Sequence, residues 1–286
     1  MKLDRPEALN IHFKVNPADI PVKIETSKKN VDIHIPEEHL TIYYPFGPRI
    51  MTGQITNEKV AAMNELCDKV LASPDRVPYN DYLAGIISDE YRLDRDQLSS
   101  IDMLDTLQWF AESYIYQCKY YNINEKEVGR DVSCRVAISD RDTWFNDQKP
   151  GEYNPPHNHT NMEIDNCGNL IISGVLYLKI PEYESRKSAA DYRNNSDGNL
   201  ILLSHSSAHR LDSGSFQYTP EVGNIILFPG HLTHMVMPFL NKNGNIRRSV
   251  AFNAHYQFLI KGQENDWWNY ETCRRCETRD KREGIV

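Results

Sequence analysis

From about residue 130 onward, the sequence is a succession of short apolar segments separated by turn residues. The segments are rich in β-branched and aromatic residues, which favour strands, and the loops between them contain PG, SDG, DSGS and NKNGN. Because no helical pattern stands between the segments, they predict an antiparallel sandwich or barrel, not a parallel sheet with crossover helices. The clearest strand predictions are DVSCRVAIS, LIISGVLYLKIP, GNLILLS, GNIILFPG and RRSVAFNAHYQFLI.

Two helices are predicted before these strands. NEKVAAMNELCDKVLAS has apolar residues at helical spacing, and SSIDMLDTLQWFAESYIYQCKYYN offers an aromatic face to bury and Ser99 or Ser100 as a cap. The predicted fold is therefore mainly β, a jelly roll with helices packed against one side. We expect one structural unit with four regions: an N-terminal arm (1–40), a helical support region (41–130), the β core (131–260) and a C-terminal tail (261–286).

The overall charge limits the partners that this chain can bind. Its 286 residues carry a formal net charge of −8, which argues against a general binder of nucleic acid or of an anionic membrane, since both need clustered Lys and Arg. The chain lacks an apolar stretch of membrane-spanning length and begins without the apolar core of a secretory signal, so a cytoplasmic protein is expected. The scattered cysteines fit reduced thiols, and the one close pair, Cys273 and Cys276, is interpreted as part of a charged tail.

Three histidines form the main candidate for a metal site. His157 and His159 stand in GEYNPPHNHT, where residues i and i+2 of an extended segment project to the same face. Pro155 and Pro156 stiffen the approach to this pair. A third histidine, His234, follows a predicted strand that ends at Pro229. A single histidine is more often a surface or hydrogen-bonded core residue, but a same-face pair with a distant third predicts a site for Fe, Zn, Cu or Ni.

The last predicted strand carries a second candidate site. In RRSVAFNAHYQF, one face presents Arg247 and Ser249 and the other face is mainly apolar. If the polar face points into a barrel, the guanidinium and the hydroxyl can bind a carboxylate together. If it points into solvent, the strand is merely amphipathic.

At these residues the sequence resembles the Fe(II)- and 2-oxoglutarate-dependent oxygenases, whose core is a double-stranded β-helix. The family pattern is H-x-D/E, then a distal His, then a basic residue that often begins Arg-x-Ser; here Arg247 follows His234 by 13 residues. SGVLYLKIP and GNIILFPGHLTHMVMP resemble the family's core strands. WFNDQKPGEYNPPHNH resembles its nucleic-acid-dealkylating branch, with Asn146 preceding His157 by 11 residues. The whole pattern, from about residue 41 to about 258, is most similar to a subgroup from phages and marine bacteria with an H-x-H motif.

The sequence departs from the family at one ligand, because His159 occupies the position of the carboxylate. Three alternatives remain at this stage. His157, His159 and His234 together form a three-histidine site, which the same-face spacing favours. Alternatively, His159 turns away and water or chloride takes its place, or Glu163 or Asp165 of the segment TNMEID completes the triad.

The resemblance implies Fe(II) and 2-oxoglutarate as cofactors. Arg247 and Ser249 would bind the distal carboxylate of 2-oxoglutarate, with Asn146 and Tyr177 as further hydrogen-bonding groups. The implied activity is hydroxylation of a C–H bond by O2 with release of succinate and CO2, on a small-molecule or protein side-chain substrate. A homodimer through the N-terminal helices is a further expectation.

Two other functions are alternatives to a 2-oxoglutarate-dependent oxygenase. A cupin-type metalloenzyme could use the same histidines without 2-oxoglutarate, but it gives Arg247 and Ser249 no role. A non-catalytic, virion-associated binding module on the same fold would explain the absent carboxylate. Trp144 is interpreted as a packing residue.

Overall fold

The structure is a computed structural model of the chain. It describes residues 41–43, 47–79, 85–122, 132–159, 170–184, 196–204 and 214–260. The predicted arm (1–40) and tail (261–286, with Cys273 and Cys276) therefore lie outside the described residues, as do Glu163 and Asp165. None of the helices in the described ranges is long and apolar enough to cross a membrane.

The strands form two antiparallel sheets. The larger sheet has seven strands in the order β1-β2-β9-β6-β11-β4-β3, and the smaller sheet has four in the order β5-β10-β7-β8. Their bounds are β1 Thr41–Tyr43, β2 Ile50–Gln54, β3 Glu90–Arg92, β4 Val132–Gln148, β5 Asn154–His157, β6 Leu170–Lys179, β7 Leu200–Leu203, β8 Ser215–Tyr218, β9 Asn224–Pro229, β10 Thr233–Val236 and β11 Arg247–Ile260.

The eight strands from β4 to β11 pair as one long hairpin that is rolled up. β4 pairs with β11, β5 with β10, β6 with β9 and β7 with β8, and all four pairs are antiparallel. From β4 to β7 and again from β8 to β11, successive strands alternate between the two sheets, and β7 and β8 both lie in the smaller one. Two further pairs, β6 with β11 and β7 with β10, join these hairpin pairs within each sheet. This connectivity is a jelly roll, or double-stranded β-helix, so the predicted fold class is confirmed.

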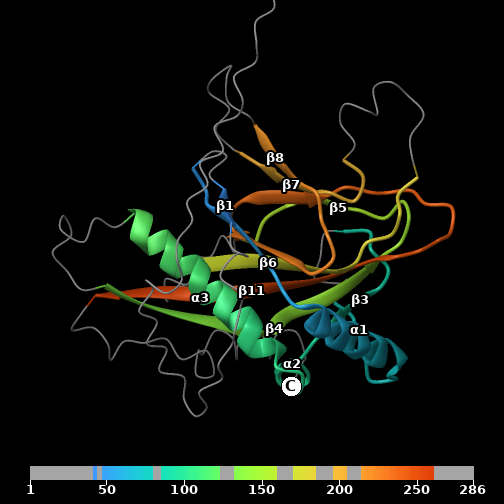
Figure 1. Cartoon of the computed structure of the whole chain (residues 1–286), viewed down its shortest axis with the longest axis horizontal. Helices are drawn as coiled ribbons and strands as arrows, with labels where there is room; N and C mark the ends of the chain where they lie inside the picture. The colour runs from blue at the N-terminus through green and yellow to red at the C-terminus, as the bar shows by residue number, and fades with distance from the viewer. Residues whose placement is uncertain are drawn as a thin grey trace, which may run out of the picture.

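The helices cover the outer face of the larger sheet. In Figure 1, α1 (Asn57–Ala72) and α3 (Met103–Asn122) lie on one side of β4, β6 and β11, and the smaller sheet lies on the other. One apolar cluster joins both helices to the outward side chains of the sheet, such as Phe145, Leu176 and Phe252. A second, smaller cluster lies between the two sheets and includes Tyr177, Leu202 and Phe228. The molecule therefore has three layers, and its site lies between the two sheets.

The helix ends differ in part from the sequence prediction. Helix α1 begins after Thr56, whose hydroxyl accepts a hydrogen bond from the Lys59 amide, and it ends at Ala72. The second helix does not begin at Ser99 or Ser100. A short helix, α2 (Arg95–Ser99), is capped by Asp94 with a capping box, and a turn through Asp102 at φ 55° separates it from α3. Asp94 is an effective cap for α2 because its carboxylate accepts a hydrogen bond from the Gln97 amide, while the Gln97 side chain accepts one from the Asp94 amide.

A buried ion pair holds α1 against the sheet. Arg248 of β11 donates two hydrogen bonds of 2.6 Å to the carboxylate of Asp147 on β4 and one of 2.7 Å to Asp68 on α1. Arg248 and Asp147 are almost fully buried, whereas the Asp68 side chain is 58% exposed. Arg248 therefore faces the helices, and its neighbour Arg247 faces the opposite side of the sheet.

Candidate metal centre and cofactor cavity

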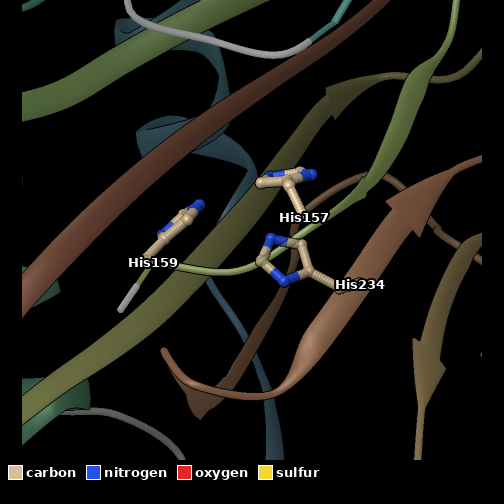
Figure 2. A group of neighbouring side chains, drawn as sticks. All are labelled: His157, His159 and His234. Atoms are coloured by element: carbon tan, nitrogen blue, oxygen red, sulfur yellow. The ribbon is translucent and has the colours of Figure 1, made fainter. Parts of the chain in front are cut away.

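The three predicted histidines meet between the two sheets. His157 ends β5 and lies directly opposite His234 of β10 in the antiparallel pair. His159 lies two residues beyond β5, and its backbone amide donates to the carbonyl of Gly230 at 2.8 Å. The ring centroids are 4.2 Å apart for His157 and His234, 4.9 Å for His159 and His234, and 5.3 Å for His157 and His159. Figure 2 shows the three rings gathered around one point.

The tautomers of His157 and His234 are fixed by backbone carbonyls. Nδ1 of His157 lies 2.8 Å from the carbonyl oxygen of Pro155, and Nδ1 of His234 lies 2.9 Å from that of Leu232. A carbonyl can only accept, so each Nδ1 carries the hydrogen and each Nε2 keeps its lone pair. This arrangement is typical of metal-binding histidines.

His159 is oriented by two side chains of the larger sheet. Its Nδ1 lies 2.7 Å from Oδ1 of Asn253 and 2.8 Å from the hydroxyl of Ser173, which itself donates to the same Asn253 oxygen. The oxygen accepts from both, so Nδ1 carries the hydrogen here too. The Nε2 atom of His159 is buried and has no hydrogen-bond partner among the described residues. A buried lone pair without a partner is costly, and a metal ion would satisfy it.

The three imidazoles are neutral at physiological pH. Burial lowers the pKa of His157, and it lowers the pKa of His159 to about 4. Burial and the two neighbouring imidazoles hold the pKa of His234 well below its usual range. Neutral imidazole is the form that binds a metal ion. The ligand atoms of the three residues lie within 4.8 Å of one another, so the donor set fits a divalent transition metal such as iron.

The metal-binding group found among the described residues contains no carboxylate. It consists of His157, His159 and His234 alone. His159 turns toward the other two rings, which matches the first of the three alternatives for this ligand. Asp165 and Glu163, the carboxylates considered from the sequence, belong to the segment that the structure does not describe.

The guanidinium of Arg247 lies in the same cavity as the histidines. Arg247 is buried, and its Nη1 donates to Oε1 of Gln148 at 2.7 Å. Its Nε and Nη2 are buried without a hydrogen-bond partner, and its guanidinium carbon lies 5.0 Å from the centre of the Tyr177 ring. Two unsatisfied, parallel N–H donors on a buried cation match the two oxygens of a carboxylate.

The other predicted cofactor residues surround Arg247. Ser249, Tyr177 and Asn146 line the cavity and are buried. Ser249 lies opposite Asn146 on β4 and Tyr177 on β6, so the three side chains share one face of the sheet. The Tyr177 hydroxyl and Oδ1 of Asn146 have no hydrogen-bond partner among the described residues. Burial raises the pKa of Tyr177 well above its usual value, so its hydroxyl keeps its proton and remains a donor.

Sequence reasoning missed several cavity residues. Ser173 and Asn253 hold His159, and Trp144, interpreted as a packing residue, lines the cavity with its ring stacked on Tyr79 at 4.7 Å. A signal existed in the alternation of the strands. Asn253 shares a strand face with Arg247, and Trp144 shares one with Asn146, so both could have been placed once that face was known to point inward.

The chain is thus a jelly-roll protein in which three histidines that could hold a metal ion share one cavity with a buried arginine. Residues 142–253 match the family described as "Putative 2OG-Fe(II) oxygenase". The resemblance inferred from the sequence is therefore confirmed for this part of the chain, which holds most of the jelly roll. The predicted cofactors, Fe(II) and 2-oxoglutarate, agree with the description of the matched family, and the three histidines could hold the iron. The comparison does not distinguish the phage and marine-bacterial subgroup, and no curated protein matches the chain.

Solved structures with a similar arrangement include a prolyl-4-hydroxylase from Pseudomonas putida, with 17% identity and a TM-score of 0.41 over 73% of this chain and 91% of that one. A prolyl hydroxylase from Trichoplax adhaerens, in complex with a hypoxia inducible factor peptide, has 12% identity and a TM-score of 0.43 over 76% and 83%. HygX from Streptomyces hygroscopicus, with nickel, 2-oxoglutarate and hygromycin B bound, has 9% identity and a TM-score of 0.43 over 73% and 83%. The jelly-roll assignment rests on the strand pairing of this chain and not on these likenesses.

Proposed function

We propose that the protein is an Fe(II)- and 2-oxoglutarate-dependent dioxygenase that hydroxylates a C–H bond of its substrate. One observation carries the proposal. A single buried cavity holds three imidazole Nε2 atoms aimed at one point and, on the same inner face of the jelly roll, the two unsatisfied N–H groups of Arg247. A metal ion and a carboxylate are the two ligands that these groups lack.

His157, His159 and His234 would hold the iron. When bound, Fe(II) with 2-oxoglutarate supplies the activation of O2 that oxidises a C–H bond and yields succinate and CO2. The hydrogen bonds of the three Nδ1 atoms to Pro155, Leu232 and Asn253 fix the rings before the metal arrives. Preorganised ligands of this kind bind more tightly because less rotational freedom is lost on binding.

Arg247 and Ser249 would bind the distal carboxylate of 2-oxoglutarate. Nε and Nη2 can donate to the two carboxylate oxygens, and the hydroxyl of Ser249 adds a third donor from the same strand face. Gln148 holds the guanidinium through Nη1 and so sets its orientation. Tyr177 supports Arg247 with its ring, and its protonated hydroxyl is a further donor. Asn146, on the neighbouring strand, would complete the contacts.

The apolar part of the cavity would keep water from the reacting groups. Side chains from five strands contribute to this wall: Val175, Leu200, Phe228, Val236 and Ala251. In a cavity with few water molecules the attraction between a bound dianion and Arg247 is stronger than in bulk solvent.

The three-histidine set is also the observation that favours the rival, a cupin-type metalloenzyme that does not use 2-oxoglutarate. Three neutral ligands leave the full charge of the metal uncompensated, whereas a carboxylate would cancel one unit. A cupin-type site, however, leaves Arg247 buried with two unsatisfied donors, at a cost of about 1–3 kcal/mol or more. We therefore favour the 2-oxoglutarate enzyme, with O2 and a small-molecule or protein side-chain substrate as its further reactants.

Anaerobic titration tests this proposal. Adding Fe(II) and then 2-oxoglutarate should produce the weak visible charge-transfer band of an Fe(II)–keto acid chelate. The band should disappear in His234→Ala and weaken strongly in Arg247→Ala. The matched controls are His231→Ala and Arg95→Ala, which change an exposed histidine and an exposed arginine. Metal binding without any response to 2-oxoglutarate would favour the cupin-type enzyme, and absence of metal binding would favour the non-catalytic module.

A further inference from the structure

On the inner face of the larger sheet, opposite the cavity-lining Asn146, β3 carries a buried carboxyl group that the proposed chemistry does not use. Glu90 is 1% exposed, and neither of its carboxyl oxygens has a hydrogen-bond partner among the described residues. A buried carboxyl group without a partner is among the least favourable arrangements in a folded protein. A ligand that donates hydrogen bonds to this carboxyl group would supply the missing partner.

Strand register places Glu90 on the cavity side of the sheet. Glu90 lies directly opposite Asn146, which lines the cavity, whereas the next residue, Tyr91, lies opposite Phe145 and packs with the helix-side core. The neighbouring backbone pair is hydrogen bonded, with the Asp147 amide donating to the Asp89 carbonyl at 2.8 Å. Glu90 and Asn146 thus form the non-hydrogen-bonded kind of pair, in which side chains lie closest.

The cavity wall on this side offers acceptors, one buried donor, Nε1 of Trp144, and one aromatic face. Asn154 and Trp144 both line the cavity, and Oδ1 of Asn154 has no hydrogen-bond partner among the described residues. The Trp144 ring is backed by Tyr79, and its centroid lies 6.2 Å from that of His159. This wall is therefore adjacent to the metal centre. Arg247 belongs to β11, which β4 separates from β3 in the sheet.

We propose that Trp144 and Asn154 of the cavity wall, together with Glu90 beside Asn146 on the same face of the sheet, form the subsite for the primary substrate and take a group that carries a protonated amine. A carboxylate, an amide oxygen and an indole face together are the partners that an alkylammonium ion requires. This inference rests on the proposed function, since it places the amine beside the metal centre at which oxidation would occur.

The charge state of Glu90 fits this role. Burial, and to a smaller extent the negative charge of Glu152, raise the pKa of Glu90 to about 8. The carboxyl group is therefore mostly protonated at neutral pH while the subsite is free of ligand. Ionising it to receive an ammonium group costs only about tenfold in affinity at pH 7, which one charge-assisted hydrogen bond in a buried site offsets.

Binding of small probes tests the subsite without turnover. The protein is loaded with Zn(II) and 2-oxoglutarate and titrated by calorimetry with n-butylammonium, with its neutral analogue 1-butanol, and with butyrate. We expect n-butylammonium to bind at least tenfold more tightly than either comparison ligand. Glu90→Gln, which keeps the shape and removes the charge, should weaken n-butylammonium at least tenfold. Glu65→Gln, a change of an exposed glutamate on α1, should leave it within twofold.

Two outcomes overturn the inference: equal binding of n-butylammonium to wild type and Glu90→Gln, or equal binding of the three probes. Should Glu90→Gln fail to fold, difference infrared spectroscopy of the wild type decides, because the band of a protonated carboxyl should be lost when n-butylammonium binds. An unchanged band contradicts the proposal.

Failure of this subsite is distinguishable from failure of the proposed function. The charge-transfer band of Fe(II) with 2-oxoglutarate is measured on the same variants, and Glu90→Gln should retain it. If the charge-transfer band is retained but n-butylammonium is not preferred, the amine subsite is ruled out and the proposed function is not. A wild type that lacks the band removes the proposed function, and the titration of the Zn(II) protein still decides whether the wall binds amines.

Discussion

His157 and His234 stand directly opposite one another in the antiparallel pair of β5 and β10, with ring centroids 4.2 Å apart. This register makes neighbours of two residues that lie 77 positions apart in the sequence, and their Nε2 atoms face the same point. His159 joins them from the segment after β5. The metal centre is thus built on the ladder of the smaller sheet and supported by side chains of the larger one.

The first prediction concerns the side chains that hold His159. Asn253→Leu removes the acceptor of its Nδ1 hydrogen, so the ring can rotate or change tautomer, and we expect metal affinity to fall about 10–100-fold. Asn253→Asp keeps an acceptor and should retain most of the affinity. Competition with a chromophoric chelator measures the affinity, and the visible spectrum of the Co(II) protein reports the ligand geometry. Equal affinities for the two variants would show that Asn253 acts only as a packing residue.

The second prediction concerns recognition of 2-oxoglutarate. Arg247→Lys keeps the positive charge and loses the planar pair of donors, so the dissociation constant for 2-oxoglutarate should rise about 10–100-fold. Metal affinity should change little, because Arg247 does not belong to the group of three histidines that would bind the metal. Titration of the charge-transfer band measures both quantities. A variant that binds 2-oxoglutarate as tightly as the wild type would remove the carboxylate site from Arg247.

The third prediction separates the two ends of the buried ion pair. Arg248→Leu leaves the buried carboxylate of Asp147 without its cation and should lower the free energy of unfolding by about 3–5 kcal/mol. Asp68→Asn removes a partner that is 58% exposed and should cost about 1 kcal/mol or less. The double variant Arg248→Leu with Asp147→Leu should regain much of the loss. Urea denaturation measures all three, and similar losses for the two single variants would contradict this account.

The fourth prediction is a pH dependence of stability that arises from Glu90. Its pKa rises from 4.5 to about 8 on folding, first because of burial and then because of Glu152. The folded state therefore binds this proton more tightly than the unfolded state does. The contribution is fully present below about pH 4.5 and is lost as the pH rises through 8, by at most about 5 kcal/mol.

Glu90→Gln does not titrate, so its stability relative to that of the wild type should increase between pH 5 and pH 9. Denaturation midpoints of both proteins across this range measure the difference, which removes the contribution of other groups that titrate in both. A difference that stays constant with pH would show that Glu90 is ionised in the folded protein throughout.

The alternation of polar and apolar residues along the last strands was the most informative feature of the sequence. It predicted that Arg247 and Ser249 share one face and that an apolar face opposes them, and the structure places these residues in the cavity and Val250 and Phe252 in the helix-side core. Turn residues separated the strands, which predicted the mainly β class. These features are local, so they can be read from neighbouring residues.

Tertiary structure decided which segments meet. The long β4, the proline-containing β5 and the register of β5 with β10 bring the three imidazoles together, and none of these follows from local propensity, because register depends on the whole rolled hairpin. The same holds for Trp144 and Glu90. Their sequence neighbourhoods resemble ordinary strand segments, and only the pairing of β3 with β4 places Glu90 beside Asn146. The sequence alone determined the types of ligand and the faces on which they lie, and long-range strand pairing decided that those faces enclose a single cavity.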